Sequence, residues 1–123
     1  MLLLDTHVVL WWRDGGARLT NQIRRAIRSA DIVLVSAASG WEVALKLGIG
    51  KLKLGQPFAW MVEQSGFTEL PVALVHAERL AALPAHHRDP FDRMLIVQAQ
   101  VEGATLVTHD RQFGLYDVPT LWV

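Results

Sequence analysis

Short apolar segments alternate along this chain with longer amphipathic segments. The apolar segments, which we expect to be strands, are residues 2–4, 31–35, 69–72, 105–108 and 120–123. The amphipathic segments, which we expect to be helices, are residues 19–30, 37–47, 57–64, 73–83 and 90–102. Such alternation is typical of a parallel sheet covered by helices. The sequence therefore predicts an α/β fold in which a central parallel sheet of four to five strands is sandwiched by helices.

Length and composition favour a single folded domain over residues 1–123. A hydrophobic fraction of 51% and a net charge of zero, from 12 Lys+Arg and 12 Asp+Glu, argue against a disordered chain. The absence of cysteine excludes disulfides, thiolate catalysis and Cys-ligated zinc. No apolar run approaches the roughly 18 residues of a membrane span, and no signal-peptide pattern precedes Asp5. We expect a cytoplasmic protein without membrane contact.

Four acidic residues are placed where they can converge on one end of the expected sheet. Asp5 directly follows the first strand, and Asp110 follows the fourth strand by two residues. Glu42 lies in the helix after the second strand, and Asp92 lies in the first turn of the helix before the fourth. Ligands of open α/β sheets bind beyond the carboxyl ends of the strands. The spacing therefore predicts an acidic site at that end.

Each acid also has a purely structural explanation. Asp5 and Asp110 fit N-caps of the helices that they precede, and Asp92 falls at a helical position where an acid favours the dipole. Glu42 is spaced i, i+4 from Lys46, in the order that forms a stabilising ion pair. Taken together, however, the four structural explanations require a coincidence of positions.

Carboxylates gathered within a few ångströms repel one another unless cations intervene. Mg²⁺ or Mn²⁺ is the natural occupant, because such hard cations bind a few carboxylates together with substrate phosphates. The combination suits attack of a metal-activated water on phosphorus. The hydroxyls of Thr6 and Thr108, next to two of the acids, are candidates for orienting a carboxylate or the water, with a local cap or turn hydrogen bond as the alternative.

Four blocks of sequence carry a specific resemblance. They are DTH at residues 5–7, SAASGWEVALK at 36–46, HHRDPFDRMLI at 86–96 and LVTHD at 106–110. In this order, over essentially the full length, they resemble the PIN-domain ribonucleases, and among these the VapC-type toxins of bacterial type II toxin–antitoxin systems. The spacing of Trp41, Glu42 and Lys46 and the block RDPFDR at 88–93 are the most specific parts.

The resemblance implies a PIN-like α/β/α sandwich and Mg²⁺- or Mn²⁺-dependent endonucleolytic cleavage of RNA, leaving a 5′-phosphate and a 3′-hydroxyl. It implies that Asp5, Glu42 and Asp92 are the principal metal ligands, with Asp110 as a fourth acid of the site. It also implies frequent homodimerisation and inhibition by a small VapB-type antitoxin. Asp89 belongs to a matching block as well, and we assign it to the N-cap of the helix that begins at Pro90.

Five basic residues near the acidic end are candidates for holding RNA: Lys46, Lys51, Lys53, Arg88 and Arg93. Residues 48–55 are expected to form a loop or short hairpin in which lysines alternate with leucines, with a solvated charged edge as the alternative explanation. Arg93 is expected either to contact the scissile phosphate or to pair with Asp89 one turn away.

Histidines and tryptophans are less informative. His86 and His87 lack a third ligand at helical spacing, and a loop leading to the N-cap explains them. A metal-activated water makes a histidine base unnecessary. Trp11 and Trp12 are adjacent and cannot both face one interior, so we expect one of them at a surface that receives an antitoxin segment or a second subunit.

Two alternatives to the ribonuclease remain. A metal-dependent phosphohydrolase acting on small phosphates would also use an acidic pocket at strand ends. The aspartyl-phosphate type of phosphatase needs a second Asp two residues after the nucleophile, whereas Asp5 is followed by Thr6 and His7. A non-catalytic PIN-like binding module would be expected to have lost an acid, and none of the four is missing.

Overall fold

Five parallel strands form one sheet in the computed structural model, which describes residues 1–123. The strands are β1 (Leu2–Leu4), β2 (Val33–Ser36), β3 (Thr68–Leu70), β4 (Thr105–Thr108) and β5 (Thr120–Trp122). Their order is β3-β2-β1-β4-β5, and every neighbouring pair is parallel. The predicted parallel sheet is confirmed, and the fifth strand forms.

The register brings the carboxyl ends of the three middle strands to one level. Leu4, the last residue of β1, pairs with Val35 of β2 and Val107 of β4. The next residue, Asp5, therefore emerges in the centre of the sheet, beside Thr108 at the end of β4. Its backbone N–H donates to the carbonyl of Val107 at 3.0 Å.

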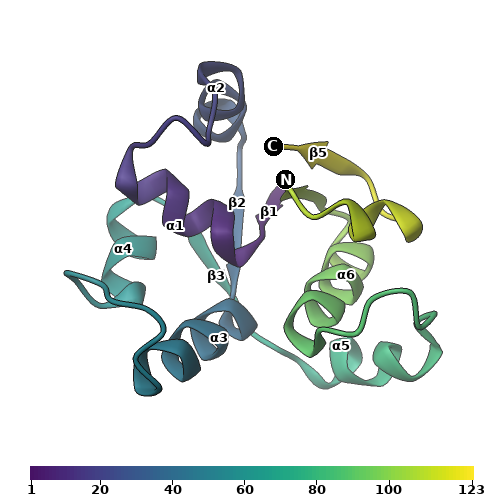
Figure 1. Ribbon diagram of the computed structural model, residues 1–123. Coiled ribbons are helices and arrows are strands. Elements are labelled where there is room, and N and C mark those ends of the chain that lie inside the picture. The colour runs from purple at the N-terminus through teal and green to yellow at the C-terminus, as the bar shows by residue number, and fades with distance from the viewer.

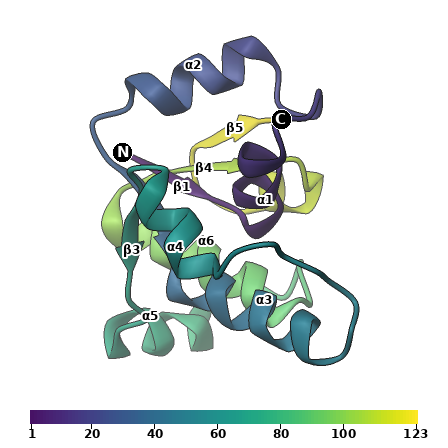
Figure 2. The ribbon, with the colours of Figure 1, turned by 90° about the vertical axis from the view of Figure 1, so that its left-hand side faces the viewer.

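Helices cover both faces of the sheet. They are α1 (Thr6–Asp14), α2 (Asn21–Ser29), α3 (Ala37–Gly48), α4 (Phe58–Gln64), α5 (Leu74–Arg79) and α6 (Pro90–Glu102), with short 3₁₀ helices η1 (Leu80–Ala82) and η2 (Arg111–Leu115). In Figure 1, α1, α2 and α4 lie on one side of the strands, and α5 and α6 lie on the other. Figure 2 shows α2 and α3 at opposite ends of the molecule with the strands between them. No helix combines the length and apolar character that crossing a bilayer requires.

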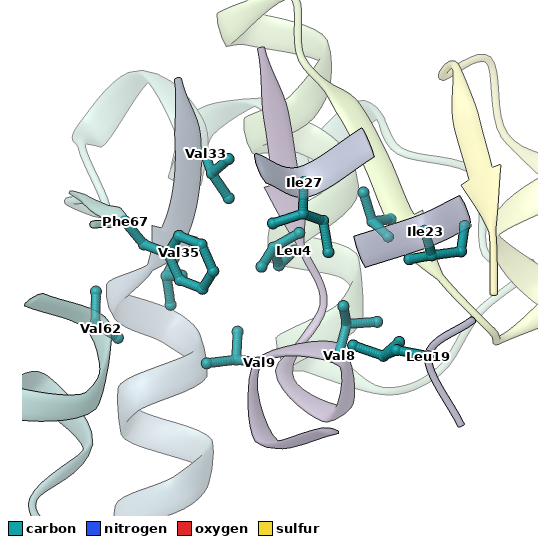
Figure 3. Packing of buried hydrophobic residues seen from close by; sticks show 11 residues of the cluster. Leu4, Val8, Val9, Leu19, Ile23, Ile27, Val33, Val35, Val62 and Phe67 are labelled. Atoms are coloured by element: carbon teal, nitrogen blue, oxygen red, sulfur yellow. The ribbon is translucent and has the colours of Figure 1, made fainter. Parts of the chain in front are cut away.

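Alternating side chains of the strands build two cores. Leu4, Val33, Val35 and Val107 face α1, α2 and α4, where they pack against residues such as Phe67. Figure 3 shows this cluster, with Val8 and Val9 of α1 and Ile23 and Ile27 of α2 closing over the strands. The neighbouring positions, including Leu3, Leu34 and Leu106, face the opposite way onto Leu95 and Ile96 of α6. The period of two along each strand thus fills both sides of the sheet.

Several element boundaries differ from those expected. Thr20 caps α2 through its hydroxyl, so the helix begins at Asn21 and not at residue 19. The strand expected at 31–35 begins at Val33, and the edge strand expected at 69–72 covers residues 68–70 and ends before Pro71. The helix expected at 73–83 divides into α5 and η1.

The end of α3 also differs from the prediction. Gly48 was expected to stop this helix but is its last residue, and the left-handed backbone that favours glycine occurs at Gly50, with φ of 73°. Residues 51–57 contain no strand, so the expected loop or hairpin is a loop. Its alternation holds nevertheless, because Leu52 and Leu54 are half-buried while Lys51 and Lys53 are exposed.

Candidate functional site

Five carboxylates gather at the carboxyl end of the sheet. Asp5 and Glu42 are buried, and Asp92 and Asp110 are half-buried. The pKa of Asp92 is raised from 3.8 to about 8, first by burial and then by the negative charges of Asp89, Asp5, Glu42 and Asp110. The four predicted acids are therefore brought together, with Asp89 as a fifth. We call Asp5, Glu42, Asp92 and Asp110 the acidic centre.

The Asp5 carboxylate is held by three donors. Its Oδ1 accepts from the backbone N–H groups of His7 at 2.8 Å and Val8 at 3.3 Å, which makes Asp5 the N-cap of α1. Its Oδ2 accepts from the hydroxyl of Thr108 at 2.6 Å, and the same hydroxyl oxygen accepts from the N–H of Asp110 at 3.0 Å. The structural role of Asp5 as a cap thus fixes its carboxylate at the acidic centre.

Thr6 lies beside Asp5 but turns to another partner. Its hydroxyl donates to Oγ of Ser39 at 2.8 Å, and both residues are buried. Thr6 therefore links α1 to α3 and makes no hydrogen bond to an acid. Of the two supporting hydroxyls that we expected, Thr108 alone orients a carboxylate.

Glu42 is a buried carboxylate with only one oxygen satisfied. Its Oε2 lies 3.0 Å from Nζ of Lys46, so the i, i+4 ion pair exists. Its Oε1 is buried and has no hydrogen-bond partner. Burying an unpartnered carboxylate oxygen is costly, and such an atom is a candidate ligand for a cation.

His87 lies inside the acidic centre, which the sequence did not predict. Its ring is buried, and its Nε2 lies 2.8 Å from Oδ2 of Asp110 and 3.1 Å from Oδ2 of Asp92. Its Nδ1 accepts from the N–H of Asp89 at 3.2 Å, which leaves the proton of a neutral imidazole on Nε2. His87 does lie in the loop that leads to the N-cap of α6, as expected, but its side chain also donates to Asp110 and lies within ion-pair distance of Asp92.

Hydrogen bonds of Tyr116 and Arg93 with backbone groups hold the loop that carries His87. The hydroxyl of Tyr116 accepts from the His87 N–H at 2.7 Å. The guanidinium of Arg93 donates to the carbonyls of Leu83 at 3.1 Å, Pro84 at 2.9 Å and His87 at 3.2 Å. Arg93 therefore does not pair with Asp89, the second of the two contacts considered for it. Its donors hold backbone carbonyls of this loop, and it forms no ion pair with the N-cap acid.

Asp89 and Asp110 occupy the capping positions that their sequence context indicated. Asp89 accepts from the N–H of Asp92 at 3.0 Å and caps α6, as predicted. Asp110 accepts from the N–H of Gln112 at 2.9 Å through Oδ1 and caps η2, while its Oδ2 faces His87. Asp110 can therefore cap η2 through one oxygen and belong to the acidic centre through the other.

Three of the other basic candidates are solvent-exposed, and the fourth, Lys46, is half-buried. Lys51, Lys53 and Arg88 make no ion pair with any acid. Arg88 directly follows His87 in the sequence. Lys46 is committed to Glu42.

The acidic centre opens to solvent through a depression of about 660 Å³. Its lining includes three acids, Asp5, Asp92 and Asp110, together with His7, His109 and Arg111. A phosphodiester of an extended polymer therefore has access to three of the four acids.

The donor set fits a hard divalent cation. His87 Nε2 and one oxygen each of Asp92 and Asp110 lie within 4.8 Å of one another, but Nε2 carries a proton and acts as a donor. The available ligands are therefore carboxylate oxygens, including the unpartnered Oε1 of Glu42. Oxygen ligands in excess of the nearby cationic groups are what Mg²⁺ and Mn²⁺ require.

Comparisons with known proteins agree with this geometry. The PIN domain family matches residues 2–119. Ribonuclease VapC22 of Mycobacterium tuberculosis is 33% identical, with 98% of each chain covered. Among solved structures, VapBC2 from Rickettsia felis bound to a promoter DNA fragment gives a TM-score of 0.74 at 14% identity, covering 98% of this chain and 96% of that one. FitAcB from Neisseria gonorrhoeae gives 0.67 at 22%, with the same coverage. The chain therefore belongs to the PIN-domain family and is a relative of the VapC ribonucleases.

Proposed function

We propose that this chain is a divalent-metal-dependent endoribonuclease that acts as the toxin of a toxin–antitoxin pair in the cytoplasm. The observation that carries the proposal is the convergence of four carboxylates, of which three line an open depression and the fourth, Glu42, has a buried oxygen without a partner. The 33% identity to a protein named as a ribonuclease supports RNA as the substrate. The fold is shared with chains of VapBC complexes, which supports a toxin of this type.

Asp5, Glu42, Asp92 and Asp110 would hold the Mg²⁺ or Mn²⁺ ion. When bound, the ion supplies an activated water and offsets negative charge on the phosphodiester. Thr108 holds one oxygen of Asp5 in place through its 2.6 Å hydrogen bond. His87 donates its Nε2 proton to Asp110 and lies 3.1 Å from Asp92, so it helps to orient these two side chains, which both line the depression. Hydrolysis in this site leaves a 5′-phosphate and a 3′-hydroxyl.

The partners that we propose are a VapB-type antitoxin and a second copy of the chain. Helix α3 and its C-cap carry an exposed apolar stripe suited to such contacts: Trp41 and Leu45 on the helix and Ile49 at the C-cap recur every four residues and are 63%, 48% and 67% exposed. Exposed apolar side chains at one helical face mark interaction surfaces. Lys46, Lys51, Lys53 and Arg88 remain proposed contacts for RNA.

The test is cleavage of an end-labelled single-stranded RNA by the purified chain. We expect cleavage with Mg²⁺ or Mn²⁺, none in EDTA, and none by Asp5→Asn or Glu42→Gln. Glu78→Gln, which changes an exposed acid on α5, is the matched control and should cleave as the wild type does. Cleavage that survives EDTA or both substitutions would contradict the proposal. Hydrolysis of a small phosphate monoester without cleavage of RNA would favour the phosphohydrolase instead.

A further inference from the structure

A second depression adjoins the one at the acidic centre. It has a volume of about 500 Å³ and shares His7, His109 and Val123 with the first as lining residues. Its remaining walls are Trp11 and Arg18. The open surface at the acids therefore continues past the two histidines and along α1 to the segment that follows this helix.

Aromatic rings form one wall of this continuation. Trp11 lies one turn after His7 on α1, and the two ring centroids are 5.8 Å apart. The ring of His109, which follows β4, meets Trp11 edge-on at 5.4 Å. Trp11 is half-buried against the core, so its position is fixed while part of the ring stays accessible. We call His7, Trp11, Arg18 and His109 the aromatic groove.

Two arginines without an acidic partner lie in the walls of the two depressions, one of them over the Trp11 ring. The guanidinium of Arg18 is 5.2 Å from the centre of the Trp11 ring, and that of Arg111, in the wall of the first depression, is 4.6 Å from the Trp122 ring. Neither arginine takes part in any of the four ion pairs of the structure. Their charges are therefore available to an anion that enters the groove.

Aromatic side chains for stacking, together with unpaired arginines for phosphates, are the equipment with which proteins hold unpaired nucleotides. We propose that the aromatic groove binds the nucleotide next to the scissile phosphodiester of a single-stranded RNA. Trp11 and the two histidines contact the base, and Arg18 contacts a phosphate. The inference rests on the proposed ribonuclease function, and it names residues that the sequence did not suggest for RNA binding.

The chain supplies a matched control pair. The guanidinium of Arg13, at the end of α1, lies 5.5 Å from the ring of Trp60 on α4. This pair has the same chemistry as Arg18 and Trp11 but lines neither of the two depressions. Substitutions there reproduce the loss of one charge or one indole ring away from the proposed groove.

The first measurement is the affinity for a fluorescently labelled single-stranded RNA of mixed sequence, by anisotropy, in the non-cleaving Glu42→Gln chain. We expect Arg18→Ala and Trp11→Leu each to raise Kd about tenfold, as losing a stacking or charge contact does. Arg13→Ala and Trp60→Leu should stay within about twofold of the Glu42→Gln chain. Arg18 is exposed, so its substitution leaves the core intact even where Trp11→Leu lowers stability.

Two further readouts separate a direct contact from an indirect one. Arg18→Ala should reduce the slope of log Kd against log salt by about 0.7, the value for one phosphate contact on a single strand, and Trp11→Leu should leave the slope unchanged. In a chain that retains Glu42, Arg18→Ala should raise KM for RNA and leave kcat unchanged.

The outcomes distinguish the groove from the nuclease. If all four variants bind RNA alike while the wild type cleaves RNA with Mg²⁺, the groove is wrong and the proposed function stands. If the wild type binds RNA with the expected loss in the groove variants but does not cleave it, RNA binding by the groove stands, and both the nuclease and the place of the groove beside a scissile phosphodiester are wrong. Absence of RNA binding by the wild type would overturn both.

Discussion

Two polar clusters, each with buried members, share helix α6 and differ in charge balance. The acidic centre lies at its amino-terminal end, where Asp92 meets the other acids. The second, which we call the histidine cluster, joins α5 to α6 and consists of His76, Gln98 and Glu102. His76 is 3% exposed, accepts from the N–H of Ala73 at 3.0 Å, and faces Glu102 at 3.2 Å. It is a paired network between two helices.

Each cluster contains one buried side-chain oxygen without a hydrogen-bond partner. In the histidine cluster it is the amide Oε1 of Gln98, whose Nε2 donates to the carbonyl of Pro71 at 3.1 Å. In the acidic centre it is the carboxylate Oε1 of Glu42. A neutral amide oxygen is far less costly to bury than a charged one. The histidine cluster therefore needs no bound ion for its stability, whereas a cation would offset the unbalanced negative charge of the acidic centre.

Substitution of Asp92 should have the largest effect on the contrast between the two clusters. Asp92→Asn should lower RNA cleavage by about a hundredfold or more, because the centre loses a ligand and a charge. The same variant, measured without divalent metal at about pH 9, should melt at a higher temperature than the wild type, since it carries no buried negative charge there. A variant that keeps its activity, or melts lower at this pH, would contradict the assignment.

The next largest effect is the dependence of stability on pH and on bound divalent metal. The pKa of Asp92 is about 8 in the folded chain against 3.8 as the usual value, so between these values the folded chain holds a proton that the unfolded chain lacks. The free energy of unfolding should therefore fall as pH rises through this window. Mg²⁺ or Mn²⁺ should raise the melting temperature, and by more at about pH 9 than at about pH 6, because the ion competes with the proton.

Calorimetry with and without metal, at matched ionic strength, checks this expectation. Asp92→Asn is the control, and its response to metal should be smaller and nearly independent of pH. An equal response of the wild type at both pH values would show that Asp92 is not a ligand.

The histidine cluster should respond in the opposite sense to the acidic centre. His76→Leu removes the acceptor of the Ala73 N–H, so the free energy of unfolding should fall by about 1–3 kcal/mol. RNA cleavage by the folded variant should equal that of the wild type. Glu102→Gln, at a partly exposed position, keeps a hydrogen-bond acceptor and should change stability by less than about 0.5 kcal/mol. Loss of activity in folded His76→Leu would join the two clusters functionally.

The fold and the acids were readable because their determinants are local. Apolar runs of the right length predicted the strands, and an acid directly after a strand, as at Asp5, predicted the edge at which it lies. Asp89 before Pro90 predicted the start of α6 for the same reason. The exact end of α3 was not readable, because Gly48 and Gly50 both satisfy the local preference and the chain uses only Gly50 for its left-handed turn.

The misplaced residues depend on contacts between distant parts of the chain. His87 reaches the acidic centre because its loop is tied to Tyr116, 29 residues later. Nothing within the loop indicates that contact, and the only available hint was its position one residue before the block RDPFDR. Arg93 was expected to contact a phosphate or to pair with Asp89, and the pairing does not form because its side chain reaches carbonyls up to 10 residues earlier. Arg18 meets Trp11 only after α1 ends and the chain turns back.

The smallest effect is expected from substitution of Tyr116, which supports the loop of His87. It tests whether charge or location makes the two clusters differ. Tyr116→Phe removes a hydroxyl that accepts from the His87 N–H and donates to the carbonyl of Pro84, both at 2.7 Å. The free energy of unfolding should fall by about 1 kcal/mol, measured by urea denaturation. Cleavage should fall by less than about tenfold, because the carboxylates stay in place and only the support of His87 is loosened.

Such a result would show that Tyr116, like the histidine cluster, contributes mainly to stability, although it lies near the acids. A neutral hydroxyl with partners on both sides contributes stability wherever it lies, whereas a carboxylate among carboxylates lowers stability and is retained for its chemistry. If Tyr116→Phe instead abolished cleavage while leaving stability unchanged, nearness to the acids would be the deciding property. The contrast between the two ends of α6 would then rest on position and not on charge.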